Sequence, residues 1–126
     1  MSGKKGKSKE NTAEKTPRQL WLEAARKVKG DVNRELEIAR LHCIPIKDKV
    51  EKQIVASAFL QKLQSAINTV DQDREKLVMK LVQAQNTSDE DWVHLAPTFN
   101  EPLDTLEGSL LAFKKEHKAD AAKMAA

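Results

Sequence analysis

The stretch that decides the fold is residues 60–84, LQKLQSAINTVDQDREKLVMKLVQA, which contains neither glycine nor proline. Its apolar side chains recur at alternating steps of three and four residues, the heptad spacing of a helix that packs along other helices. The resulting seam comprises Leu60, Leu63, Ile67, Val70, Arg74, Leu77, Leu81 and Ala84. This pattern predicts an all-α protein organised around one long helix.

Arg74 is the one charged member of that seam, and it has two interpretations. A polar seam residue can fix helix register or oligomeric state. Alternatively, its aliphatic stem covers apolar surface while the guanidinium reaches water.

A second helix is predicted upstream, over residues 16–44. Thr16 and Gln19 have the spacing of a capping box, and Pro17 suits the first helical position. The apolar residues that follow step by three or four and so share one helix face. They are Trp21, Ala25, Val28, Val32, Leu36, Ala39 and Cys43.

Glycine and proline set the expected limits of these helices. Gly30 either weakens the first helix or breaks it, with Asp31 capping a second segment. Pro45 is expected to end the helix, because proline pushes the preceding residue out of helical geometry. The long helix is then predicted over residues 46–86. Apolar residues in its first half step by four only, which we interpret as a coiled-coil stutter.

The remaining sequence predicts a connector and a third helix. Ser88 begins a capping-box pattern, so a short capped turn is expected over residues 88–95. Pro97 and Pro102 bracket a predicted loop, and a helix follows over residues 102–122. Its seam consists of Leu103, Leu106, Leu110 and Phe113.

Charge is distributed unevenly along the chain. Residues 1–15 hold five lysines and two glutamates and lack Val, Ile, Leu and aromatic residues, so they are predicted to form a disordered tail. The rest of the chain has equal numbers of basic and acidic residues. Residues 87–107 contain six acidic side chains and no Lys or Arg. The tail lysines suited to contacting phosphates are Lys4, Lys5, Lys7 and Lys9.

Helices of these lengths, folded up, down and up, would lie side by side only around residues 64–74. Elsewhere, part of the wide apolar stripe would face water, which favours self-association or docking on another helical protein. The alternative is that the helices bend, break at the glycines and close into a compact bundle.

The candidate chemical sites are sparse. Cys43 follows His42, but adjacent helical residues do not face each other, so a half-buried thiol is the preferred interpretation over a nucleophile. His94 and His117 lack clustered ligand partners, and we expect neither a metal site nor a cofactor. Three aromatic residues are interpreted either as caps on the bundle ends, which we prefer, or as interface hot spots. These are Trp21, Trp92 and Phe99.

The sequence therefore predicts an elongated three-helix antiparallel bundle or coiled coil over residues 16–126, preceded by a disordered basic tail. We expect a non-enzymatic protein–protein interaction module, either a homo-oligomer or a scaffold or adaptor subunit of a larger helical complex. The alternative is a nucleic-acid-associated protein that uses the tail as a phosphate-binding arm. No small-molecule substrate is expected. No apolar stretch approaches the roughly 20 residues that span a bilayer, so we expect no membrane partner and an intracellular location, in the nucleus or cytoplasm.

Overall fold

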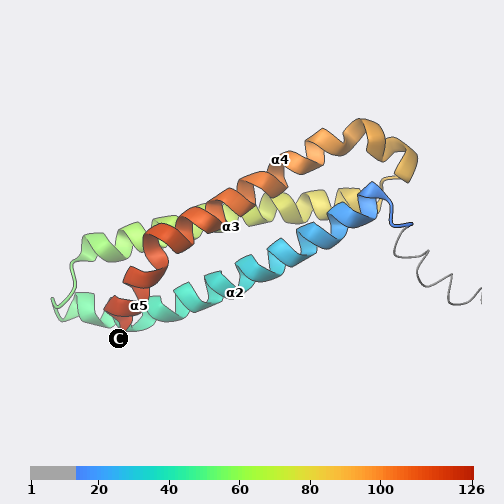
Figure 1. The fold of residues 1–126 in the computed structure, drawn as a ribbon. Helices are drawn as coiled ribbons and strands as arrows, with labels where there is room; N and C mark the ends of the chain where they lie inside the picture. Colours follow the sequence, from blue (N-terminus) through green and yellow to red (C-terminus); the bar gives the residue numbers. More distant parts are fainter. Residues whose placement is uncertain (1–13) are drawn as a thin grey trace, which may run out of the picture.

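The fold is a long bundle of antiparallel helices (Figure 1). The computed structural model describes residues 14–126. Its elements in chain order are α2 (Pro17–Glu51), α3 (Ser57–Gln85), α4 (Asp89–Phe113), the π-helical segment η1 (Lys114–Lys118) and α5 (Ala119–Ala125). The predicted all-α three-helix bundle is confirmed. Except for its last two residues, the tail predicted over residues 1–15 lies outside the described residues.

Both predicted helix starts are built as their sequences indicate. Thr16 Oγ1 accepts a hydrogen bond from the Gln19 N–H at 3.2 Å, and Gln19 Oε1 accepts one from the Thr16 N–H at 3.0 Å. This reciprocal pair is the capping box. Ser88 Oγ accepts from the Asp91 N–H at 3.1 Å and caps the start of α4 with this side-chain hydrogen bond.

The predicted end of the first helix at Pro45 is wrong, because α2 continues through this proline to Glu51. Proline removes one helical hydrogen bond and deprives the carbonyl of Leu41 of its partner, at a cost of about 3 kcal/mol. Leu41 is exposed, so water can hydrate that carbonyl. Beyond the proline, Ile46 is completely buried in the core, and its packing favours continuation of the helix.

The single helix predicted over residues 46–86 is also wrong, because a turn separates α2 from α3. The Gln53 N–H donates to the Val50 carbonyl at 3.0 Å, and the Ile54 N–H donates to the Lys49 carbonyl at 2.8 Å. Gln53 has φ of 61°. Together these features form a Schellman C-cap, which normally has Gly at this left-handed position. The change in the spacing of apolar residues before residue 60 reflects this turn, so the predicted coiled-coil stutter is wrong.

Helix α4 replaces both the short turn predicted over residues 88–95 and the helix predicted from Pro102. It passes through Pro97 and Pro102 and curves over the end of the bundle in its first turns (Figure 1). The two carbonyls that lose a helical partner belong to residues 93 and 98, both exposed to water. The prolines therefore shape the helix without ending it.

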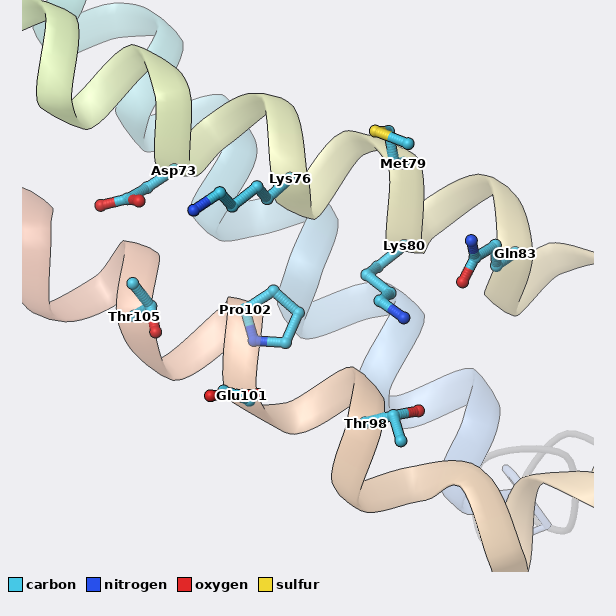
Figure 2. A pocket seen from close by; sticks show the side chains of 9 residues that line it. All are labelled: Asp73, Lys76, Met79, Lys80, Gln83, Thr98, Glu101, Pro102 and Thr105. Atoms are coloured by element: carbon cyan, nitrogen blue, oxygen red, sulfur yellow. The ribbon is translucent and has the colours of Figure 1, made fainter.

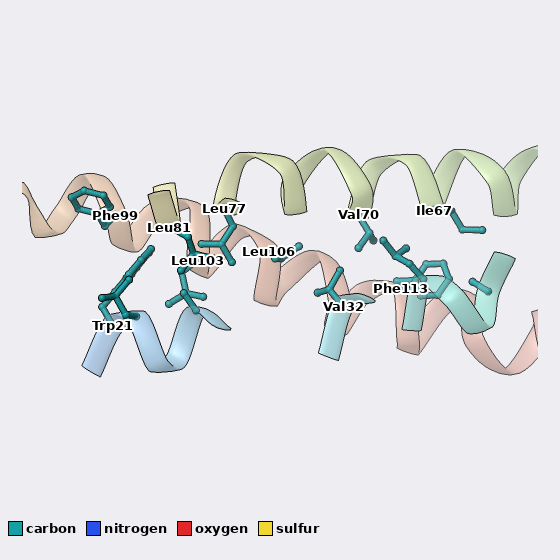
Figure 3. Close-up of a cluster of buried hydrophobic side chains, with 14 of the residues drawn as sticks. Trp21, Val32, Ile67, Val70, Leu77, Leu81, Phe99, Leu103, Leu106 and Phe113 are labelled. Carbon is teal, nitrogen blue, oxygen red and sulfur yellow. The ribbon is translucent and has the colours of Figure 1, made fainter. Parts of the chain in front are cut away.

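The early start of α4 closes the bundle. Because the third helix begins at residue 89 and not 102, it lies along much more of α3 than the sequence predicted. The seam side chains interdigitate between α2, α3 and α4 (Figure 3). Leu77 and Leu106 are completely buried. The elongated bundle thus closes along its length without the helix breaks that the compact alternative required, and the predicted overlap limited to residues 64–74 is wrong.

Neither glycine breaks its helix. Gly30 and Gly108 lie inside α2 and α4, and both are exposed. A Cβ atom added at either position would meet nothing within 4 Å. Gly30 is therefore not the break that its sequence position allowed.

The segment after α4 crosses from α3 toward α2 (Figure 1). In η1, the wider π-helical turn changes which side of the helix faces the core. Lys118 Nζ reaches Glu35 of α2 at 3.0 Å, and Ala121 of α5 is buried against the bundle. Lys49 Nζ then donates to the Met124 carbonyl at 2.9 Å, which fixes the last turn of α5 to α2.

Candidate interaction surface

The predicted interaction seam is the core of one chain. Nine of its residues are buried, and Leu110 is half-buried at the edge of the cluster. The buried members are Leu60, Leu63, Ile67, Val70, Leu77, Leu81, Leu103, Leu106 and Phe113. These side chains are already covered within the monomer, so an interface must use other residues.

Arg74 links α3 to α2 at the edge of that core. Its Nη2 donates to Asp71 at 2.7 Å and to Glu75 at 2.9 Å, and its Nη1 donates to Asn33 of α2 at 3.2 Å. The side chain is half-buried, so its stem covers apolar surface while its guanidinium is held by polar groups. Arg74 thereby contributes to the register between α2 and α3.

Three aromatic residues close one end of the bundle. The Trp92 and Phe99 rings stack with centroids 4.6 Å apart, and Trp21 lies 5.5 Å from each. All three side chains are buried, which confirms the interpretation as end caps. Lys80 Nζ lies 5.4 Å from the centroid of Phe99, within the range of a cation–π contact. Within the described part of the chain, Trp21 Nε1 has no acceptor.

The histidines and the cysteine do not assemble into a reactive site. Cys43 is half-buried, and burial raises the pKa of its thiol against a smaller opposing effect of Arg40, which keeps the thiol protonated and weakly nucleophilic. His117 packs near Phe113, and its Nε2 lies 3.9 Å from Glu116. Over residues 14–126, no group of three or more His, Cys, Asp or Glu side chains is placed to hold a metal ion.

A cleft of about 580 Å³ lies between α3 and α4 where α4 curves. Figure 2 shows Lys76 and Lys80 reaching from α3 toward α4, with Thr98 and Pro102 on the facing helix. The other lining residues are Asp73, Met79, Gln83, Glu101 and Thr105. The cleft is open to solvent and contains charges of both signs, so its lining selects no single class of small ligand.

The outward face of α4 is a continuous exposed stripe. Its residues step alternately by four and three, so they share a side of the helix that is turned away from the buried seam. They are Val93, Pro97, Asn100, Asp104, Glu107 and Leu111, all exposed. Val93 and Leu111 are 70% and 69% exposed, so large apolar side chains stand at the two ends of this stripe.

Acidic residues are concentrated in the same helix, α4. α4 contains six Asp and Glu residues and no Lys or Arg, whereas α2 and α3 each contain more basic than acidic side chains. Within residues 14–126, only Asp89 of these six forms an ion pair, with Arg18 Nε at 2.8 Å. That hydrogen bond to Arg18 lowers the pKa of Asp89. The other five are all exposed, and two of them, Asp104 and Glu107, belong to the stripe, whereas Glu90, Asp91 and Glu101 lie on other sides of the helix.

The sequence shows the cluster of acidic residues but did not lead to the prediction that they lie on a long helix. The run of acidic residues over 87–107 is evident in the sequence. Because Pro97 and Pro102 led to the prediction of a loop, these residues were placed in a connector and not in a helix. Residues of an irregular connector do not share one side of a helix, so the exposed stripe from Val93 to Leu111 was not predicted. The signal that was available is the alternating step of four and three along the exposed positions.

Comparisons with known proteins add no relative to this description. The chain matches no protein-family model, and neither curated proteins nor solved structures give a significant match. Among the described helices, none is both long enough and apolar enough to cross a membrane.

Proposed function

We propose that this protein is a non-enzymatic interaction module that binds a basic helical protein through the outward face of α4. The observation behind the proposal is the exposed stripe of α4, in which Val93 and Leu111 flank two acidic residues on a helix without Lys or Arg. One-sign charge steers a partner of opposite charge, and exposed apolar side chains supply contact area once it docks.

The separation of Val93 and Leu111 indicates the length of the proposed partner helix. Val93 and Leu111 are 18 residues apart, which corresponds to about 27 Å along a helix. A partner helix of five turns matches that length, with apolar residues near its ends and Lys or Arg between them. The rigid bundle presents this face without rearrangement, because its core is complete beneath the stripe.

A symmetric homodimer through this face is disfavoured. In a two-fold interface the same patch lies on both sides, so Asp104 and Glu107 would oppose the same acidic residues of the second copy. Like charges brought together across an interface oppose association. The predicted homo-oligomer through the seam also loses its basis, since the seam residues are core. A different protein with a basic surface is therefore the proposed partner.

The test compares affinity capture from cells that express the protein, using two variants with matched changes. The first replaces Val93→Ser, Asp104→Lys and Leu111→Ser on the outward face of α4. We expect proteins with a basic helical surface to be captured by the natural chain and reduced about tenfold or more with this variant, which corresponds to about 1.4 kcal/mol of binding free energy.

The matched control makes the same kinds of change on α2. It replaces Leu41→Ser, Ile44→Ser and Glu37→Lys, and all three side chains are exposed. This control should retain the captured proteins. If both variants lose the same proteins, or neither loses any, α4 is not the binding surface and the proposal fails.

A further inference from the structure

We propose that residues 114–126, which comprise η1 and α5, form a strap that opens and closes on α2 while the rest of the bundle stays folded. The ion pair between Lys118 of the strap and Glu35 of α2 determines whether the strap is closed. This device uses none of the residues on the outward face of α4, so it goes beyond the proposed function.

Glu35 is an unusual residue for its position. Among residues 14–126 it is the only charged residue that is buried, and it shares a side of α2 with the core residues Val32 and Ala39. Its side chain is 11% exposed, and its Oε2 accepts a hydrogen bond from Lys118 Nζ at 3.0 Å. A carboxylate removed from water is costly unless a partner compensates it. The closed strap supplies that partner.

An apolar side chain in place of Glu35 would suit the core at least as well, because buried ion pairs seldom stabilise more than the apolar residues that could replace them. The carboxylate therefore contributes little to the stability of the closed form as such. What it adds is a condition, since the closed form is favourable only when Lys118 reaches Glu35.

The strap itself buries little apolar surface. Residues 114–126 are all described, and Ala121 is the only one of them that is buried. The single methyl group of an alanine gives much less burial than Leu103, Leu106 and Phe113, which anchor α4 in the core. Segments with few buried apolar contacts open at low free-energy cost, independently of the core. Polar contacts such as that of Lys118 with Glu35 thus account for much of the attachment.

The strap also has a structural boundary at its start. α4 ends at Phe113, which is buried, and residues 114–118 then adopt the π-helical form, with no buried residue among them. A π-helical turn is rare and commonly occurs at functional positions. The change of helix type directly after a buried anchor places the hinge of the strap in η1.

The closed strap covers a patch on the second half of α2, where α5 lies in Figure 1. Ala121 and Lys118 line one small cavity together with Glu35, Ala39 and His42 of α2. When the strap opens, this patch, with its carboxylate among apolar side chains, becomes accessible. The fraction of open molecules then sets how much of the protein displays the patch.

Native-state hydrogen exchange of the full chain, followed by NMR, tests this device. Amides of residues 119–125 should exchange through local opening, so low concentrations of urea should hardly change their rates. Amides near Leu77, which is completely buried in α3, should exchange only through global unfolding and should accelerate as urea is added. The two groups of amides therefore report on the strap and on the bundle separately.

Three variants test whether the ion pair is the cause. Lys118→Met leaves Glu35 without its partner and should accelerate exchange at residues 119–125 about tenfold or more, with no change near Leu77. Lys115→Met is the matched control, because Lys115 is an exposed residue of the same η1, and it should change neither group. Adding Glu35→Met to Lys118→Met removes the unpaired charge and should restore slow exchange.

Three results would overturn the proposed strap. The first is equal exchange at residues 119–125 in Lys118→Met and Lys115→Met, which is expected of simple fraying at a helix end. The second is an equal response of residues 119–125 and of the amides near Leu77 to urea or to Lys118→Met, which would show that both unfold together. The third is a double variant that exchanges as fast as Lys118→Met alone.

Discussion

Replacing Gly30 and Gly108 by alanine should stabilise the protein. Both residues lie in exposed helix interiors, and a Cβ atom at either would meet nothing within 4 Å. Alanine therefore introduces no clash, while it reduces the conformational entropy of the unfolded chain and favours the helix by about 0.4–1 kcal/mol per site.

The two sites have no neighbour in common within that radius, so their effects should add. The double variant Gly30→Ala, Gly108→Ala should then gain about 1–2 kcal/mol in the free energy of unfolding. For a domain of this size, that corresponds to a rise of roughly 4–10 °C in Tm. Urea and thermal unfolding followed by circular dichroism measure both quantities.

The reverse substitution provides the control. Ala24 is exposed within α2, and Ala24→Gly should lower the free energy of unfolding by about 1 kcal/mol. A destabilised Gly30→Ala variant would refute the continuous α2. It would show that this glycine adopts a conformation that alanine cannot, as the broken-helix interpretation requires.

Three further predictions concern the core, the turn and the end of the bundle. Leu77→Ala should lower the free energy of unfolding by about 2–5 kcal/mol in urea, because the side chain is completely buried. Gln53→Gly should raise it by about 0.5–1 kcal/mol, since glycine accepts the left-handed conformation at the C-cap, whereas Gln61→Gly inside α3 should lower it by a similar amount. Arg18 lowers the pKa of Asp89 in the folded state, so their pair stabilises the fold above the ordinary carboxyl pKa and this contribution is lost as pH falls below about 4. Arg18→Gln should therefore reduce the loss of stability between neutral and acidic pH in unfolding curves, and an unchanged slope would contradict the assignment.

The heptad pattern predicted the core because packing depends on side-chain periodicity. Nine of the eleven residues in the predicted seams, which run from Leu60 to Leu81 and from Leu103 to Phe113, are buried. Periodicity alone does not say whether the covering helix belongs to the same chain. Whether one chain covers its own seams depends on where the third helix begins. Its start was predicted at residue 102, whereas α4 begins at Asp89.

Prolines account for that error and for the misplaced end of the first helix. Pro45 and Pro97 were expected to limit helices, since each lacks an N–H and restricts the residue before it. Each lies on an exposed or half-buried side of its helix, where the freed carbonyl can be hydrated. Apolar packing of the nearby Ile46 and Phe99, respectively, favours a continuous helix over a break.

The turn between α2 and α3 was missed for a different reason. Its left-handed position holds Gln53, and no glycine or proline signals a helix end between residues 46 and 57. Only the change in apolar phase indicated it, and a stutter gives the same pattern. The π-helical η1 likewise has no local sequence signal, and the contact of its Lys118 with Glu35 joins residues 83 positions apart, which local patterns do not reveal.

The most direct test of the whole account is the absolute mass of the full chain in solution, measured by light scattering after size exclusion over a dilution series. If the seams are satisfied within one chain, the protein is a helical monomer of 14.2 kDa at every concentration. A mass that doubles as concentration rises would contradict this, and would return the seam residues to an interface between copies.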